Sequence, residues 1–230
     1  MKRLFVIVVG IIIVGAVYWN NFKPEGRDSA SINDSADTEQ DESATDNDMV
    51  IVMTDQEITP PLILLNKPLS SAHTRVTKKQ FGIKISPQES PVSPERFSGY
   101  HTGVDFEILP GEEDEDVIVA AICSGPLIFI NNSVSGYGGV VAQTCTVEKQ
   151  EVTVIYGHIR VGSIKHAINS QLKAGETFAV LGSGYSSETD GERKHLHLGI
   201  YKGTEGKYLL GYVSNESSLS GWLNILDYLP

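Results

Sequence analysis

Residues 140–159 read VVAQTCTVEKQEVTVIYGHI and contain two of seven runs rich in β-branched residues. Clusters of Gly, Asn and Ser separate these runs, a pattern typical of short β-strands between turns. The sequence therefore predicts a mainly β domain. The runs are residues 117–122, 127–130, 140–147, 152–159, 178–181, 196–201 and 207–213.

Two further segments carry weaker signals. Residues 131–139 hold three glycines between two apolar runs, which predicts a long hairpin connection. Only residues 219–229 favour a helix, and we expect a short one packed on the sheet.

The N-terminus predicts export from the cytoplasm. Lys2 and Arg3 precede an uninterrupted apolar run over residues 4–19. As a helix these residues would span about 24 Å, short of a hydrocarbon core of about 30 Å. No A-x-A cleavage site follows, so we favour the interpretation that residues 1–20 are an uncleaved membrane anchor. The alternative is a cleaved signal peptide, and cleavage would give a secreted protein. Either alternative predicts an extracytoplasmic domain.

Residues 21–60 form a different kind of segment. They contain eleven acidic and two basic side chains, within a chain of formal net charge −11. Too little apolar surface is present to offset the entropy of ordering, so we expect an acidic disordered linker before a folded domain over residues 61–230. Neither part has a basic patch that would neutralise phosphates, so nucleic acid is not an expected partner.

The chain has two cysteines, Cys123 directly after one predicted strand and Cys145 within another. In an exported domain an even pair indicates a disulfide, and the two strands could be neighbours in an antiparallel sheet. Two buried free thiols remain an alternative. Metal ligation is a third, although no C-x-x-C spacing supports it.

Histidines and one aspartate form the candidate site. His195 and His197 flank Leu196 in a predicted strand, so both imidazoles project from one face. His101 and Asp105 share the same parity in another predicted strand. Three nitrogen or oxygen ligands with one open position are typical of a catalytic zinc site.

Several motifs, in this order, resemble the lysostaphin-type family of zinc metallopeptidases, which cut the peptide cross-bridges of peptidoglycan. The resemblance covers about residues 75–201. The motifs are Arg75-Val76-Thr77, Phe81-Gly82-Ile83, His101 to Asp105, Gly136-Tyr137-Gly138-Gly139, Tyr156-Gly157-His158, Lys173-Ala174-Gly175-Glu176 and His195-Leu196-His197.

The resemblance implies a mostly antiparallel β core with the metal in an open groove. It implies that Zn²⁺ is held by His101, Asp105 and His197, and that His158 and His195 are catalytic. A zinc ion there would activate water and polarise the scissile carbonyl. We assign the proton acceptor to His195, and the implied substrates are peptidoglycan stems or cross-bridges.

The sequence departs from the family pattern in two places. An acidic run follows the first motif at residues 112–116, and residues 185–194 replace a shorter Gly/Ser-rich approach to His195. We expect both to be loops in the walls of the groove. The alternative for the acidic run is an ordinary solvated loop. His73 and His166 have no partner at ligand spacing and are expected at the surface. The tyrosines beside the motifs could contact substrate or pack in the core; they are Tyr100, Tyr137 and Tyr156.

Two alternatives to an enzyme remain. One is a catalytically silent module of the same fold that binds the wall or activates another hydrolase; the presence of all five candidate residues argues against it. The other is a membrane-tethered adaptor with a structural zinc site, which would have four protein ligands. A regulatory partner is possible in each case, and the sequence does not identify one.

Overall fold

The computed structural model describes residues 64–204 and 206–230. The predicted anchor (residues 1–20) and acidic linker (residues 21–60) lie outside these residues and stay predictions. Within the described part, no helix has the length and hydropathy needed to cross a bilayer.

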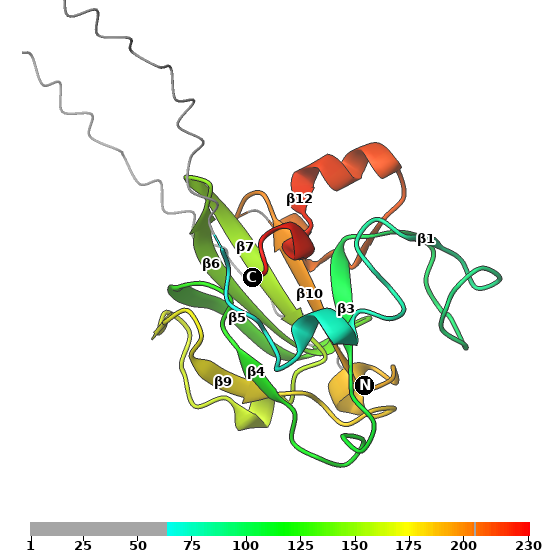
Figure 1. Cartoon of the computed structure of the whole chain (residues 1–230), viewed down its shortest axis with the longest axis horizontal. Helices are drawn as coiled ribbons and strands as arrows, with labels where there is room; N and C mark the ends of the chain where they lie inside the picture. The colour runs from blue at the N-terminus through cyan, green and yellow to red at the C-terminus, as the bar shows by residue number, and fades with distance from the viewer. Residues whose placement is uncertain (1–63, 205) are drawn as a thin grey trace, which may run out of the picture. The chain divides into compact units, whose positions relative to one another are not determined.

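In the described residues, the largest sheet has seven antiparallel strands in the order β12-β10-β7-β6-β5-β8, with β3 also paired to β10. Figure 1 shows β10 between β3 and β7. The strands are β3 (Gly103–Glu107), β5 (Gly125–Val134), β6 (Gly138–Val147), β7 (Gln150–Gly157), β8 (Gln171–Leu172), β10 (His195–Tyr201) and β12 (Trp222–Leu223).

Two smaller sheets flank the large one. The first has the order β1-β2-β11 and the second pairs β4 with β9. Their strands are β1 (Lys84–Ile85), β2 (Gly99–His101), β4 (Ile118–Ala120), β9 (Thr177–Val180) and β11 (Tyr212–Val213). The helices among the described residues are short 3₁₀ turns: η1 (Ala72–Arg75), η2 (Val161–Ser163), η3 (Ser187–Thr189), η4 (Gly206–Leu209), η5 (Glu216–Gly221) and η6 (Ile225–Asp227).

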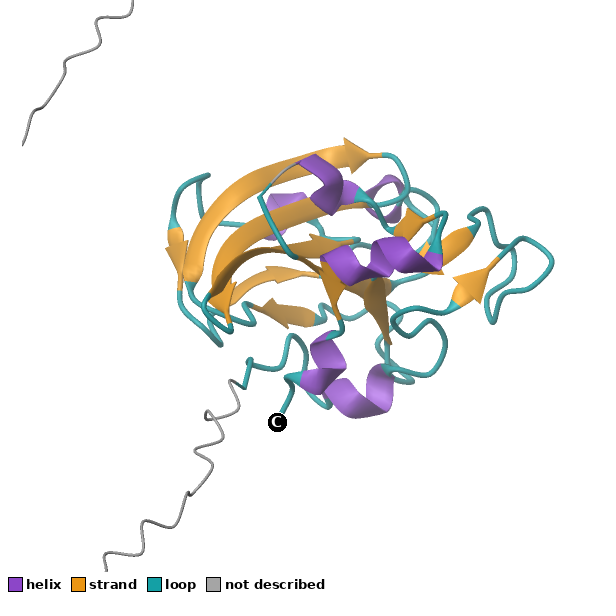
Figure 2. Cartoon of the chain, turned by 90° about the horizontal axis from the view of Figure 1, so that it is seen from above, coloured by secondary structure: helices purple, strands orange, loops and turns teal. Residues whose placement is uncertain are grey.

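The predicted mainly β, antiparallel fold is confirmed for the described residues. Figure 2 shows that the long strands are bent along their length rather than flat. The apolar face of the large sheet packs against the β4–β9 sheet, because Val119 and Phe178 belong to the same core cluster as Leu196 and Leu198. Each such side chain contributes about 1.5–3 kcal/mol through burial. This packing holds β10 in place from one side.

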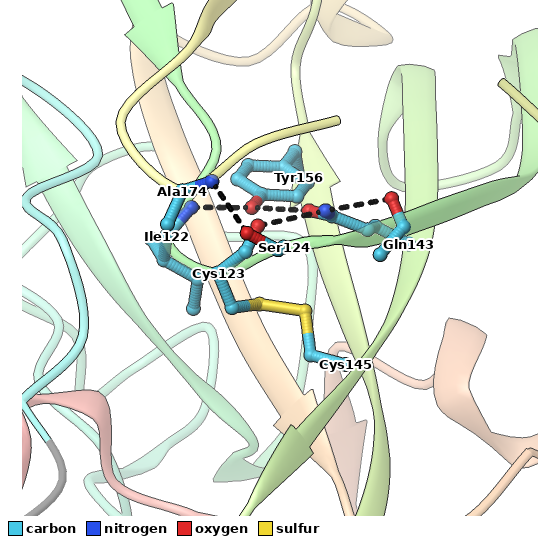
Figure 3. Close-up of a disulfide and its surroundings, with 8 residues drawn as sticks. Ile122, Cys123, Ser124, Gln143, Cys145, Tyr156 and Ala174 are labelled. Carbon is cyan, nitrogen blue, oxygen red and sulfur yellow. Dashed lines mark hydrogen bonds between the residues drawn. A yellow bond between two sulfur atoms is a disulfide. The ribbon is translucent and has the colours of Figure 1, made fainter. Parts of the chain in front are cut away.

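The predicted disulfide is also confirmed. Cys123, after β4, is bonded to Cys145 in β6, with Cα atoms 6.1 Å apart. Figure 3 shows the hydrogen bonds around it: Gln143 donates to the Cys123 carbonyl (2.9 Å) and accepts from the Tyr156 hydroxyl (3.1 Å). That hydroxyl accepts from the Ile122 amide (3.0 Å). Tyr156 is therefore a fully buried core residue.

Three predicted elements differ from the structure. The long connection over residues 131–139 is shorter, because β5 and β6 continue around a register shift and are joined by residues 135–137. Residues 207–213 form η4 and then only the two-residue β11, because Leu209 packs against the Tyr137 cluster. Residues 219–229 are not one helix, because Trp222 and Leu223 pair with β10 and separate η5 from η6.

Candidate metal centre

Strand pairing brings the predicted metal ligands close together. His197 lies opposite Asp105 of β3 on one side of β10 and opposite Gly157 of β7 on the other. Strand β2 ends at His101, and β3 begins only after Thr102. The Thr102 hydroxyl donates to the Leu210 carbonyl (2.6 Å). The predicted single strand through His101 and Asp105 is therefore two strands in different sheets. Both side chains are nonetheless brought to His197.

Three donor atoms face one another at this point. His101 Nε2 lies 3.0 Å from His197 Nδ1 and 3.2 Å from Asp105 Oδ1. The remaining distance, from His197 Nδ1 to Asp105 Oδ1, is 3.2 Å. A tetrahedral ion with bonds of about 2.0–2.1 Å holds its ligand atoms about 3.3–3.4 Å apart. The three side chains, which are the candidate metal-binding group among the described residues, fit zinc in chemistry and in spacing.

Each donor residue has a second partner that orients it. The N–H at His101 Nδ1 donates to the Gln80 carbonyl (3.3 Å), and the Tyr137 hydroxyl lies 3.4 Å from His197 Nε2, where it can accept an N–H. Arg193 Nη2 donates to Asp105 Oδ2 (2.8 Å). These contacts leave the lone pairs of His101 Nε2, His197 Nδ1 and Asp105 Oδ1 directed at the common centre, as in known zinc sites.

Two glycines provide the space for this arrangement. A Cβ atom at Gly103 would lie 2.8 Å from two ring atoms of His197, and one at Gly157 would collide with the Tyr137 ring. Any larger residue at either position would displace His197 or its partner. The close packing around His197, a predicted metal ligand, therefore explains the glycines of the His101–Asp105 and Tyr156–His158 motifs.

The two predicted catalytic histidines lie beside the donor atoms. The N–H at His195 Nδ1 donates to the Arg193 carbonyl (2.8 Å), and its Nε2 lies 3.3 Å from Asp105 Oδ2. The His158 ring lies 4.2 Å from the His195 ring, and its buried Nδ1 has no hydrogen-bond partner in the part of the chain that the structure describes. His158 has a φ of 61°, an uncommon left-handed conformation for a residue with a side chain.

A cavity of about 230 Å³ opens onto these groups. Asp105, His158, His195 and His197 lie in its wall, whereas His101 lies behind them. The rest of the wall comes from five separate segments, represented by Lys79, Phe97, Tyr137, Arg193, and Leu209 to Tyr212. The site therefore combines a donor triad with a space that a small part of a substrate can enter.

Burial and charge set the protonation of these groups. Burial lowers the pKa of His197 to about 4, although Asp105 opposes this shift. Burial and then the neighbouring His195 hold the pKa of His158 well below its ordinary 6.5. Burial would raise the pKa of Asp105, but His195 and His101 outweigh it and hold that pKa well below 3.8. A carboxylate and neutral imidazoles are the forms that bind a metal.

Several charged residues at the site were not predicted. Lys79 and Glu95 form an ion pair with side chains 2% and 1% exposed, and Lys79 donates to the Tyr212 hydroxyl (3.0 Å). Both lie in irregular segments, where no periodicity points to a buried face. Arg193 and Glu107 were also missed, but a signal existed: they share the parity of His195 and Asp105 and therefore the same face.

The two segments that depart from the family pattern lie differently relative to the cavity. Residues 112–116 do not line the cavity, so the prediction that they form its wall is wrong. Instead Glu112 receives two hydrogen bonds from the buried Arg75 (2.6 and 2.8 Å), because an arginine there needs a carboxylate partner. Of residues 185–194, Glu192 and Arg193 do line the cavity.

The remaining predicted residues lie apart from the donor atoms. His73 is exposed and contacts the Pro230 carbonyl (3.0 Å), and the half-buried His166 pairs with Glu176 (3.0 Å). Tyr100 does not line the cavity; Lys84 lies over its ring. Tyr137 is the tyrosine of the three that contacts the site.

No protein-family model matches the chain, and no curated protein matches it. Solved structures do. Helicobacter pylori Csd3 is 20% identical, with a TM-score of 0.46 over 73% of this chain and 35% of Csd3. The catalytic domain of the antimicrobial peptidase lysostaphin from Staphylococcus simulans is 18% identical, with a TM-score of 0.44 over 68% of this chain and 95% of that domain.

The structure of whole lysostaphin gives an identity of 18% and a TM-score of 0.45, over 71% of this chain and 53% of lysostaphin. The chain thus spans about a third of the length of Csd3 and about half that of lysostaphin. Similarity at this level does not assign an activity. Lysostaphin, whose family the sequence motifs resemble, is among the solved structures to which the chain is similar.

Proposed function

We propose that this chain is a zinc-dependent endopeptidase that hydrolyses peptide cross-bridges of peptidoglycan. One observation carries the proposal: His101 Nε2, Asp105 Oδ1 and His197 Nδ1 lie 3.0–3.2 Å apart beside a cavity that also contains His158 and His195. Three protein ligands with an open side are typical of a catalytic zinc ion, whereas a structural ion has four.

When bound, zinc supplies an activated water and a Lewis acid for the scissile carbonyl. His195 fits the role of proton acceptor. Its Nδ1–H is fixed by the Arg193 carbonyl, so Nε2 carries the lone pair. After Nε2 takes up a proton, Asp105 Oδ2 at 3.3 Å stabilises the resulting imidazolium.

His158 fits a different role. Its low pKa keeps the ring neutral at pH 7, so it carries a single N–H. It packs against His195 in the cavity wall and can donate that N–H to the negative charge that develops on the carbonyl oxygen. Such a preorganised donor contributes about 10²–10³-fold to the rate.

The substrate and the location are supported by the sequence. The ordered motifs resemble peptidoglycan endopeptidases, and the apolar residues 4–19 predict export. We therefore propose an extracytoplasmic enzyme, anchored to the cytoplasmic membrane by residues 4–19 or secreted if these are cleaved. Its substrates would be peptide stems or cross-bridges outside the membrane.

The test uses purified full-length protein on peptidoglycans that differ in their cross-bridges. We expect release of new amino termini from at least one wall type, loss of that release with a zinc chelator, and recovery on adding zinc. His195→Ala should bind zinc and be inactive, while His166→Ala, a histidine outside the site, should resemble the wild type.

Two results would contradict the proposal. Activity that survives complete removal of zinc would exclude the mechanism. Binding of peptidoglycan by the zinc-loaded protein without hydrolysis of any wall type would favour the catalytically silent module instead.

A further inference from the structure

Arg193 is a buried arginine next to the donor triad. Its side chain is 8% exposed, and it lies just before β10, two residues from His195. Its Nη2 donates to Asp105 Oδ2 (2.8 Å) and also to Glu107, while Nε donates to both Glu107 oxygens (3.0 and 2.9 Å). One guanidinium therefore joins two carboxylates of the same strand.

The contact divides the two oxygens of Asp105 between different partners. Oδ1 faces the donor atoms of His101 and His197, each 3.2 Å away. Oδ2 faces Arg193 and His195. A carboxylate free to rotate could present either oxygen, or both, to a metal. With Oδ2 held by Arg193, only Oδ1 is available.

Glu107 sets the orientation of the guanidinium. It lies two residues after Asp105 in β3, on the same face, and opposite His195 in register. Its two oxygens receive hydrogen bonds from Nε and Nη2, the forked geometry that fixes an arginine plane. Glu107 is thus placed to act on Asp105 through Arg193.

The side chains of the residues on both sides of Arg193 are anchored as well. Glu192 accepts from Arg96 Nε (2.9 Å). Lys194 Nζ donates to the carbonyls of Glu112 (2.8 Å) and Glu113 (3.1 Å). Residues 185–194 therefore present Arg193 in a fixed position.

Stability alone does not explain this arrangement. Buried ion pairs often contribute little, because desolvation offsets the attraction between the charges. Here Arg193 Nη1 is buried without a hydrogen-bond partner among the described residues, which adds a further cost. Orientation of Asp105 accounts for the geometry better than stabilisation of the fold does.

We propose that Arg193, held by Glu107, is a positioning residue that fixes Asp105 as a one-oxygen metal ligand. This rests on the proposed function only in that the donor triad binds zinc. Known partners of metal ligands, when removed, typically cost about 10–100-fold in metal affinity. Arg193→Gln should therefore weaken zinc binding by about 10–100-fold.

The experiment measures zinc affinity of the full chain by competition with a chromophoric chelator, and the visible spectrum of the cobalt-substituted protein. Arg193→Gln should weaken zinc binding and alter the cobalt bands. Arg160→Gln is the matched control, because Arg160 pairs with Asp116 and Glu188 and has no contact with Asp105. It should leave both measurements as in the wild type.

Two further variants sharpen the test, and the first of them keeps it decisive if Arg193→Gln folds poorly. Arg193→Lys keeps the charge but cannot hold both carboxylates, so zinc affinity should fall between wild type and Arg193→Gln. In Glu107→Gln/Arg193→Gln the affinity should match Arg193→Gln alone within about twofold, because Glu107 acts through Arg193.

The inference fails if Arg193→Gln and Arg193→Lys bind zinc as tightly as the wild type with unchanged cobalt bands. It also fails if Glu107→Gln/Arg193→Gln binds zinc much more weakly than Arg193→Gln alone. A wild type that binds no zinc would overturn both this inference and the proposed function. A wild type that binds zinc but cuts no wall would overturn only the proposed function.

Discussion

The two faces of β10 are equally buried and chemically opposite. Leu196, Leu198 and Ile200 on one face are at most 1% exposed and belong to the apolar core. His195 and His197 on the other are 2% and 4% exposed, and each has polar partners. The same depth of burial thus serves packing on one face and the candidate metal site on the other. Substitutions on the two faces should therefore separate stability from function.

The largest effect is expected from His197→Ala. It removes one of three donor atoms, so zinc affinity should fall by at least about 100-fold and hydrolysis should become undetectable. Without metal, the free energy of unfolding should stay within about 1 kcal/mol of the wild type, because functional groups are rarely optimised for stability. Isothermal titration with zinc and urea unfolding in chelator measure the two quantities. Unchanged zinc binding would refute the ligand assignment.

The next effect concerns the histidines that we place outside the metal ligands. His195→Gln and His158→Gln should each lower kcat by about 10²–10³-fold. Zinc content after dialysis should remain as in the wild type. Loss of zinc from either variant would show that the residue is a ligand instead, and the open side of the site would be lost with it.

Leu198→Ala tests the apolar face. Truncating a fully buried leucine should cost about 2–5 kcal/mol in the free energy of unfolding. The zinc affinity of the folded protein should be unchanged, because Leu198 points away from the donor atoms. Urea unfolding and zinc titration of the same sample give both values. A parallel loss of zinc affinity would show that the two faces are coupled.

The disulfide supports the same apolar side. Cys123 and Cys145 are 22 residues apart, and closing a loop of that length stabilises a fold by about 3 kcal/mol. Cys123→Ser/Cys145→Ser should lower the free energy of unfolding by that amount, without changing kcat below the unfolding temperature. In thermal unfolding, reductant should destabilise the wild type by the same amount and leave the double variant unchanged.

A smaller effect is expected from pH. The hydrogen bond from Arg75 lowers the pKa of Glu112 below its ordinary 4.5. The ion pair therefore stabilises the fold above pH 4.5 and loses its contribution as the pH falls through the lowered pKa. Glu112→Gln should cost about 1–3 kcal/mol at pH 7, because it leaves the buried Arg75 without its carboxylate, and progressively less towards pH 3. A difference between the proteins that does not shrink with acid would contradict this.

The same comparison explains what the sequence could predict. The alternation of Leu196 with His195 and His197 identifies both faces of β10, because side chains alternate in any strand. The cysteine pair likewise follows from composition and export signals. These features depend on local pattern alone.

Other features depend on contacts distant in sequence. The strand pairing that separates η5 from η6 is fixed only when Trp222 meets Tyr201. Lys79 and Glu95 are buried by neighbours that no local period identifies. Arg193 lies on the predicted face, but nothing in the sequence states that it reaches both Asp105 and Glu107.

The most direct test of the account is a crystal structure of the zinc-soaked protein with anomalous diffraction recorded at the zinc edge. We expect one anomalous peak within about 2.0–2.2 Å of His101 Nε2, Asp105 Oδ1 and His197 Nδ1, with its fourth side open to the cavity. Absence of a peak there, or a peak closed by a fourth protein ligand, would contradict the catalytic metal site.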